Sequence, residues 1–330
     1  MINAATAAIS ATPARSHSDS RALNRYAWAV LVYNVAVVLW GAAVRATGSG
    51  AGCGDHWPLC NGTVIQRYPT AATLIEFAHR ASSGVALIAV FGLLFWTFRV
   101  TGRRHLARAG AVAAVVLTLN EALLGALLVL LGKVAHDQSA SRAVYLALHL
   151  TNTLLLLAAL ALTAHFLSRK QGFMRGSVEF RAPGLVLTGL IATLIVGVTG
   201  SLAALGDTLY PATSLRAALA QDFSNSSSWI VRIRWAHPVV SLIAGVFLLW
   251  LVFHGTRSVF NRKLSFTVAA LLFLQYALGV ADIALLAPTW MQMVHLLGAD
   301  LLWIALIILA ARLCVRPIGC TEGLCSVRAA

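Results

Sequence analysis

The sequence predicts an all-α integral membrane protein with eight transmembrane helices. Hydrophobic residues make up 59% of the 330 residues and charged residues only 11%, and the mean hydropathy is +0.80. Ordinary soluble domains are about 45–50% apolar and about 25% charged. The apolar residues also form long unbroken runs, whereas a transmembrane barrel shows short alternating segments. These observations exclude a water-soluble enzyme and a disordered chain.

Eight runs are long enough to cross a bilayer, which takes roughly 20 helical residues. In chain order they cover residues 26–46, 77–98, 107–131, 143–167, 183–205, 231–253, 264–286 and 290–312. Residues 1–25 are rich in Ala, Ser and Thr and lack the apolar core of a cleavable signal peptide. We expect this segment to be the cytoplasmic tail of a bacterial protein, with a mitochondrial presequence as the alternative.

The distribution of basic residues predicts the orientation. The net charge is +14, and Lys and Arg gather in the tail and in alternate loops, at 99–108, 169–181, 257–263 and 312–328. The positive-inside rule then places both termini in the cytoplasm and the long loops 47–76 and 206–230 on the outer face. We expect a multi-pass protein of the bacterial plasma membrane, whose charge orients it in the lipid bilayer. Nucleic-acid binding is not expected, since no basic domain with interleaved aromatic residues exists.

The chain also repeats itself. Ala78-His79 recurs as Ala236-His237, and Leu148-His149-Leu150 recurs as Val294-His295-Leu296. Weaker repeats relate 119–125 to 274–279, and Thr47-Gly48-Ser49 to Thr199-Gly200-Ser201. We therefore expect two four-helix bundles, 26–168 and 183–313, related by a pseudo-twofold axis along the membrane normal. A cytoplasmic linker, 169–182, joins them, and a cytoplasmic tail, 314–330, follows.

Four histidines lie inside predicted spans at one depth near the outer face: His79, His149, His237 and His295. Ionisable residues within spans are rare and usually functional. A pair of imidazoles inside a four-helix bundle suits the axial ligation of heme iron, whereas zinc sites usually add Cys or carboxylate ligands. We expect two heme sites, His79 with His149 and His237 with His295. Their common depth argues against an electron wire across the membrane.

The two halves differ beside these histidines. Glu76 precedes His79 by three residues, and Arg234 precedes His237 by three. A carboxylate beside a metal-bound substrate can accept a proton or stabilise a developing cation, while a guanidinium suits a heme propionate. The asymmetry therefore favours a substrate in the N-terminal half and a fixed cofactor in the C-terminal half. The alternative for Glu76 is an ordinary first-turn residue favoured by the helix dipole.

The cysteines fall into two groups. Cys53 and Cys60 lie in the first outer loop, where an oxidising environment predicts a disulfide. It is either a structural staple or a redox-active pair beside the substrate site. Cys314, Cys320 and Cys325 lie in the cytoplasmic tail, where we expect reduced thiols without an assigned role. One further polar residue within a span, Glu121, fits either a proton path or a helix–helix hydrogen bond.

Several motifs together resemble the heme A synthase family of cytochrome oxidase assembly. They are the run GAAVRATGSG at 41–50, the loop from Cys53 to Cys60 with WPLCNG at 57–62, the motif Glu76-x-x-His79-Arg80, and the histidines 149, 237 and 295. The resemblance implies oxidation of a ring methyl of heme O to the formyl group of heme A. It implies heme b on His237 and His295, substrate heme between His79 and His149, and Glu76 as the catalytic residue. It also implies heme O synthase, a farnesyltransferase, as neighbour.

One departure concerns the C-terminal heme. Pro238 follows His237 where the first repeat has Arg80, so we expect a bend at the ligand. The possible propionate contacts are Arg45, Arg80, Arg232 and Arg234. Two other classes of function stay open: a diheme b-type electron-transfer subunit with unmodified hemes, and a heme carrier or exporter. The Glu76/Arg234 asymmetry favours the enzyme over both.

Overall fold

The computed structural model describes residues 17–64, 67–168, 178–180, 184–255 and 261–317. Most of the predicted N-terminal tail and linker, together with Cys320 and Cys325, lies outside these residues. Within them, eight helices are long and apolar enough to cross a membrane, and each predicted span falls on one of them. The prediction of an all-α, multi-pass membrane protein is therefore confirmed.

The elements follow one another with short connections. They are α1 (His17–Ala46), the 3₁₀ turn η1 (Ser49–Ala51), α2 (Ala71–Val100), α3 (Leu106–Leu130), α4 (Ala140–Ser168), β1 (Val178–Phe180), α5 (Gly184–Leu209), α6 (Leu215–Phe223), α7 (Trp229–Arg232), α8 (Ala236–Gly255), α9 (Arg262–Ala284), α10 (Thr289–Cys314) and β2 (Val315–Pro317). Polar side chains cap several starts. Thr70 accepts the Thr73 N–H at α2, and Ser214 accepts the Ala217 N–H at α6.

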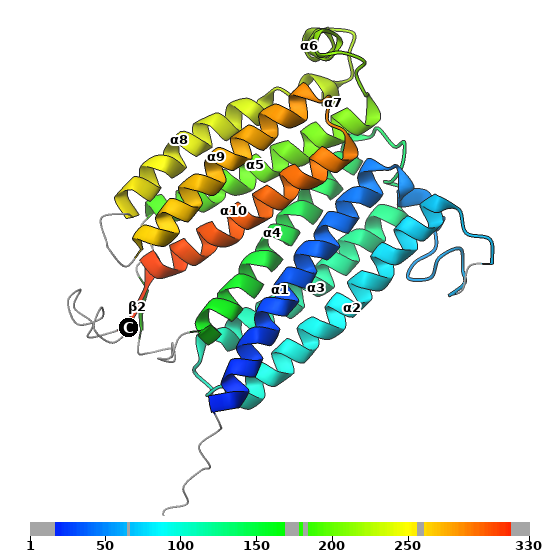
Figure 1. Cartoon of the computed structure of the whole chain (residues 1–330). Helices are drawn as coiled ribbons and strands as arrows, with labels where there is room; N and C mark the ends of the chain where they lie inside the picture. Colours follow the sequence, from blue (N-terminus) through cyan, green and yellow to red (C-terminus); the bar gives the residue numbers. More distant parts are fainter. Residues whose placement is uncertain (1–16, 65–66, 169–177, 181–183, 256–260, 318–330) are drawn as a thin grey trace, which may run out of the picture.

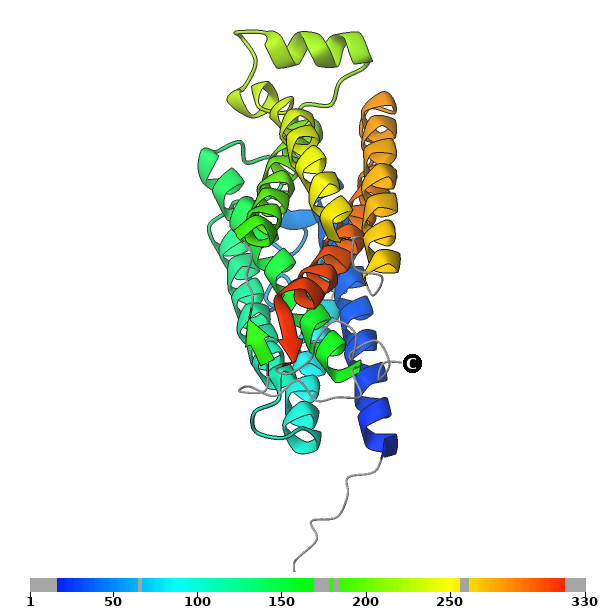
Figure 2. The ribbon, with the colours of Figure 1, turned by 90° about the vertical axis from the view of Figure 1, so that its left-hand side faces the viewer.

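The eight long helices form two groups of four, which Figures 1 and 2 show side by side. In the N-terminal group, α1 packs against α2, α2 against α3, α3 against α4 and α4 back against α1. The C-terminal group repeats this closure with α5, α8, α9 and α10. As a result α2 and α4 occupy opposite corners of one group, and α8 and α10 occupy opposite corners of the other. These four helices carry the four histidines.

The two groups meet through α1, α4, α5 and α10. The centre of α4 is a run of small and aliphatic side chains, with Leu157, Leu160 and Ala161 fully buried. Trp303 of α10 donates its indole N–H to the carbonyl of Leu154 across this interface, at 2.7 Å. Small residues allow helices to approach closely in membranes, and large apolar side chains such as Ile88 and Val280 remain exposed on the outside, where lipid would cover them.

The sixth predicted span is interrupted. Residues 233–235 form a turn between α7 and α8, so that α8 begins at Ala236, one residue before His237. Pro238 then lies in the first turn of a helix, where its missing N–H leaves no hydrogen bond broken. The expected bend at the ligand is therefore a helix start. Four short elements had no counterpart in the prediction: η1, α6, and the two strands of the antiparallel pair β1–β2. Of these, α6 lies across one end of the molecule beyond α7 (Figures 1 and 2).

Candidate functional site

The structure brings one histidine pair into direct proximity. The ring centroids of His237 and His295 are 6.4 Å apart with the planes at 84°. Two imidazole–metal bonds of about 2 Å, together with the ring radii, come to about this separation. Both rings remain half-buried, as do those of His79 and His149 on the opposite corners of the N-terminal group. The His237–His295 pair thus fits a metal ion held from two sides.

Glycines on neighbouring helices make room for three of these rings. A Cβ at Gly41 would come within 2.9 Å of His79 Cε1, and a Cβ at Gly200 would come equally close to His237 Cε1. A Cβ at Gly279 would lie 3.2 Å from His295 Cε1. Glycine inside a helix costs about 1 kcal/mol of stability relative to alanine. A glycine in the interior of a long apolar run therefore indicates a place where a neighbouring side chain packs closely against the helix.

These contacts correct the register of the weaker repeats. Gly200 corresponds to Gly41 rather than to Gly48, which ends α1 with a φ of 69°. On α3 and α9 the structure pairs Glu121 with Gln275, because each contacts the histidine of the following helix. Each also lies four residues before a glycine, Gly125 or Gly279. The Leu119/Leu274 alignment is therefore wrong by one residue.

Polar side chains lie beside three of the four imidazoles. Thr199 Oγ1 is 3.2 Å from His237 Nδ1. Gln275 Nε2 lies 3.2 and 3.3 Å from the two ring nitrogens of His295 and donates to the His295 carbonyl at 3.0 Å. Glu121 Oε1 is 3.1 Å from His149 Nδ1. Partners of this kind orient a metal-ligating imidazole and fix its tautomer. His79 Nδ1 and His149 Nδ1 are both buried without a hydrogen-bond partner among the described residues, and of these two nitrogens His149 Nδ1 has the Glu121 carboxylate beside it.

Glu121 belongs to a polar cluster between α3 and α4. Its carboxylate accepts hydrogen bonds from Thr153 and Asn152. Asn152 in turn accepts from Asn120 Nδ2 at 2.8 Å and donates to the Leu117 carbonyl at 2.9 Å. The predicted helix–helix hydrogen bond of Glu121 is thus confirmed, while the proton path stays a prediction.

The disulfide between Cys53 and Cys60 is confirmed, with a Cα–Cα distance of 4.4 Å and both residues fully buried. Glu76, only 3% exposed, holds this loop: its Oε2 accepts the Cys53 N–H at 2.8 Å, and its Oε1 accepts from Arg80 at 2.5 Å. Arg80 also donates to the carbonyls of His56 and Leu59, at 2.5 and 2.8 Å. The acidic residue of the N-terminal half is therefore attached directly to the disulfide loop.

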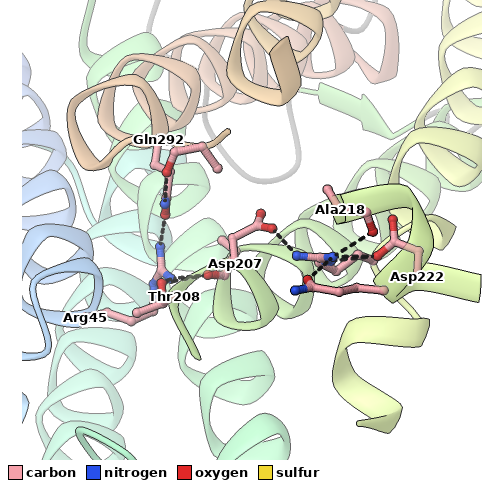
Figure 3. A network of polar contacts seen from close by, with 10 residues as sticks. Arg45, Asp207, Thr208, Ala218, Asp222 and Gln292 are labelled. Carbon is pink, nitrogen blue, oxygen red and sulfur yellow. Dashed lines mark hydrogen bonds and ion pairs between the residues drawn. The ribbon is translucent and has the colours of Figure 1, made fainter. Parts of the chain in front are cut away.

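Two further arginines are bound inside the protein, as Figure 3 shows. Arg45 of α1 donates to the Ala204 carbonyl and Thr208 Oγ1 of α5, at 2.8 and 2.9 Å, and to Gln292 Oε1 of α10 at 2.9 Å. It thereby links the N-terminal group to the C-terminal group. Gln292 lies three residues before His295, on the same side of α10.

Arg234, 8% exposed, pairs with two carboxylates, Asp207 of α5 and Asp222 of α6, each at 2.8 Å. Figure 3 labels both aspartates. Arg234 thus fastens α6 to the end of the helices. Arg232 is exposed. The predicted propionate contacts of Arg45, Arg80, Arg232 and Arg234 stay predictions.

The histidine pair fits a metal ion whose other ligands come from a bound cofactor rather than from the protein. Within the described part of the chain, no three His, Cys, Asp or Glu side chains gather at one point, as a protein-ligated zinc site would need. Heme iron takes four ligands from the macrocycle and one or two axial imidazoles from the protein. The histidine pair at 6.4 Å, backed by glycines, matches that requirement.

Comparisons with known proteins identify relatives of this chain. A protoheme IX farnesyltransferase of Thermus thermophilus is 44% identical over 292 residues, 86% of this chain and 47% of that protein. The chain thus spans about half the length of that relative. A heme A synthase of Bacillus licheniformis is 29% identical over 264 residues, 74% of this chain and 80% of that protein. One of Exiguobacterium sibiricum is 36% identical over 166 residues, covering 50% and 53%.

The match to a family model covers most of the chain. The model of the cytochrome oxidase assembly protein family, COX15-CtaA, matches residues 24–307. This range takes in six of the eight long helices completely and most of α1 and α10, together with the disulfide loop and the four histidines. The chain therefore belongs to the COX15-CtaA family of cytochrome oxidase assembly proteins.

Proposed function

We propose that this protein is a heme A synthase, which oxidises a ring methyl of heme O to the formyl group of heme A. The observation that carries the proposal is the His237–His295 pair, whose separation of 6.4 Å suits axial ligation of one heme. A second histidine pair lies on the corresponding helices of the other group, beside a buried carboxylate instead of an arginine. A diheme electron-transfer subunit or a heme carrier would not require a carboxylate at one site and an arginine at the other.

In this proposal His237 and His295 hold heme b, and Gly200, Gly279 and Thr199 position their rings. Heme b would supply one-electron chemistry, exchanging electrons with an external electron partner. Arg234 and Arg232 lie at the start of the same segment and are the nearest cations in sequence for the propionates. Arg45 connects this site to the other half through Gln292.

The N-terminal group would bind heme O as substrate between His79 and His149. Glu76 lies one helical turn before His79, so its carboxylate can take up a proton or stabilise positive charge near the substrate. With water as the oxygen source, two successive oxidations add two hydroxyl groups to the methyl carbon and release four protons and four electrons, which pass to an external electron acceptor. The resulting geminal diol loses water to leave the aldehyde. The bonds from Glu76 to Cys53 and Arg80 fix the direction of the carboxylate.

The location and orientation of the protein in the membrane are also inferred. We infer a bacterial plasma membrane location with both termini in the cytoplasm, from the basic inner loops. The four-helix groups then represent the domains 26–168 and 183–313, related by a pseudo-twofold axis, with 169–182 as linker and 1–25 and 314–330 as tails. The matching order of packing within each group supports this relation. The disulfide loop and α6 would lie on the outer face, where the chemistry takes place.

We also infer that a heme O synthase supplies the substrate. The Thermus thermophilus relative, named a protoheme IX farnesyltransferase, has about half its length outside the match to this chain. A farnesyltransferase next to this protein would pass an apolar product through the bilayer without releasing it to water.

A conversion assay tests the activity. The protein and Glu76→Ala are expressed in membranes that contain heme O but make no heme A, and hemes are extracted and identified by mass. We expect heme A only with the wild type, and heme b retained in both. Wild-type levels of heme A from Glu76→Ala would remove the role of Glu76. Unchanged heme O with the wild type, at about two hemes b per chain, would instead establish the electron-transfer subunit.

A further inference from the structure

We propose that Glu121 is a positioning residue for His149, which makes the N-terminal imidazole a stronger donor to iron than its C-terminal counterpart His295. The inference rests on the proposed function, since it takes His149 as a ligand of the substrate heme. It assigns a task to a carboxylate inside the membrane that lies well away in sequence from Glu76 and the disulfide loop.

The contact is direct. Glu121 Oε1 is 3.1 Å from His149 Nδ1, and both side chains are about one-quarter exposed, at 22% and 26%. The imidazole N–H direction is not aligned with the oxygen, so the contact is an ion-pair distance rather than an ideal hydrogen bond. With Nδ1 turned to the carboxylate, Nε2 is the nitrogen left for the iron.

Neighbouring side chains hold the carboxylate in place. Thr153 and Asn152 both donate to it from α4, and Asn152 is itself fixed by Asn120 and the Leu117 carbonyl. Glu121 therefore cannot turn away without breaking a network of buried polar groups, which is costly in an apolar environment. The carboxylate is thus held beside His149 Nδ1.

The C-terminal group carries the matched amide. Gln275 occupies on α9 the place that Glu121 occupies on α3, four residues before Gly279 and Gly125 respectively, and it contacts the His295 ring at 3.2 and 3.3 Å. The two sites thus differ by a carboxylate against an amide at equivalent positions. The Glu121 carboxylate can accept a charge-assisted hydrogen bond from an imidazole N–H, which raises the basicity of a ligating imidazole. Gln275 instead presents its amide Nε2 to the ring, which can only donate.

This difference suits the two roles. A more basic axial ligand stabilises the higher oxidation states of iron, which lowers the reduction potential. It would be placed in the half where a substrate methyl is oxidised. The neutral Gln275 leaves the other heme with a higher potential and an ordinary imidazole. The difference in reduction potential between the two hemes thus follows from the exchange of Glu121 for Gln275 at equivalent positions.

The test exchanges the two side chains. Glu121→Gln and Gln275→Glu are purified with heme bound, and the iron–imidazole stretching frequency and the reduction potential of each heme are measured by resonance Raman and spectroelectrochemistry. We expect Glu121→Gln to lower the stretching frequency and raise the potential of the N-terminal heme only, and to weaken heme retention there about tenfold. Gln275→Glu should shift the C-terminal heme in the opposite direction. The intact spectrum of the unaltered half shows that each variant is folded.

Two control variants separate the interpretations. Thr153→Val removes one helix–helix hydrogen bond but keeps the carboxylate beside His149. It should therefore leave the iron–imidazole stretching frequency and the reduction potential of the N-terminal heme close to wild type. An unchanged signature in Glu121→Gln, or an equal shift in Thr153→Val, would overturn the positioning role. His149→Ala tests the underlying assignment: if the N-terminal heme keeps its ligand signature in that variant, His149 is not a ligand and the proposed site fails with it.

Discussion

At the scale of single residues, the place of three of the four imidazoles depends on a glycine one helix away. Gly41, Gly200 and Gly279 belong to α1, α5 and α9, while the rings that they accommodate belong to α2, α8 and α10. A side chain at any of these positions must displace the imidazole or separate the helices. The ligands are therefore positioned by helix packing as much as by their own rotamers.

This packing predicts a selective effect of one methyl group. Gly200→Ala should push His237 from its place and lower heme affinity in the C-terminal group about tenfold, because the new Cβ would lie 2.9 Å from Cε1. Gly41→Ala should do the same to the N-terminal heme. The matched controls are Gly84→Ala and Gly125→Ala, which meet nothing within 4 Å. Heme titration followed by absorbance measures each affinity, and equal losses in the control variants would refute the explanation.

The sequence identified the four histidines, because an ionisable residue inside an apolar run is conspicuous. It could not identify their partners. Glu121, Gln275 and Thr199 come close to imidazoles of other helices through tertiary packing, at separations of 20 to 38 residues along the chain. Such contacts depend on the rotation of each helix about its axis, which hydropathy alone does not fix.

At the scale of elements, Arg234 explains the presence of α6. The helix has nine residues, too few for stability on its own, and its Leu215, Leu219 and Phe223 are exposed. Arg234 bonds to Asp222, Gln221 and the Ala218 carbonyl of α6 and to Asp207 of α5. The short helix is thus held by charge rather than by apolar burial.

Removing this arginine should release α6. Arg234→Ala leaves two carboxylates without their cation, which we expect to cost about 3 kcal/mol of local stability and to expose residues 210–228 to protease. Arg216→Ala is the control, because Arg216 is exposed on the same helix. Limited proteolysis of the purified protein with mass identification of the cuts measures this. Equal cleavage of the two variants would show that Arg234 does not hold α6.

The long helices were predictable from length and hydropathy alone, and all eight were found. The interruption at 233–235 and α6 were not, since both depend on the burial of one arginine between acidic groups from different elements. The β1–β2 pair joins strands of three residues from segments far apart in the chain, and segments so short carry no periodic signal.

At the scale of the whole molecule, the disulfide loop and the two helix groups form one structure. The disulfide loop is attached to α2 through Glu76 and Arg80, and Arg45 joins α1 to α5 and α10. Both cysteines of the loop are fully buried, which limits attack by an external thiolate. Between the two predicted roles of the disulfide, burial favours the structural staple.

A double substitution tests that role. Cys53→Ala with Cys60→Ala should lower the free energy of unfolding by about 2 kcal/mol, the value for so short a closed loop, while heme A formation continues at a rate of the same order. Cys314→Ala, which removes a cysteine outside the disulfide, is the control for stability. Thermal unfolding and the conversion assay are the measurements. A folded double variant that has full heme b and no product would point to a redox-active pair.

The central claim is that one chain holds two different hemes, one as cofactor and one as substrate. The most direct measurement is to purify the protein from membranes that also make heme O, extract the bound hemes, and determine their identity and stoichiometry by chromatography and mass. We predict heme b at about one per chain, together with heme O, its hydroxylated form or heme A. Heme b alone, at about two per chain, would contradict the claim and leave the asymmetry between Glu76 and Arg234 without a function.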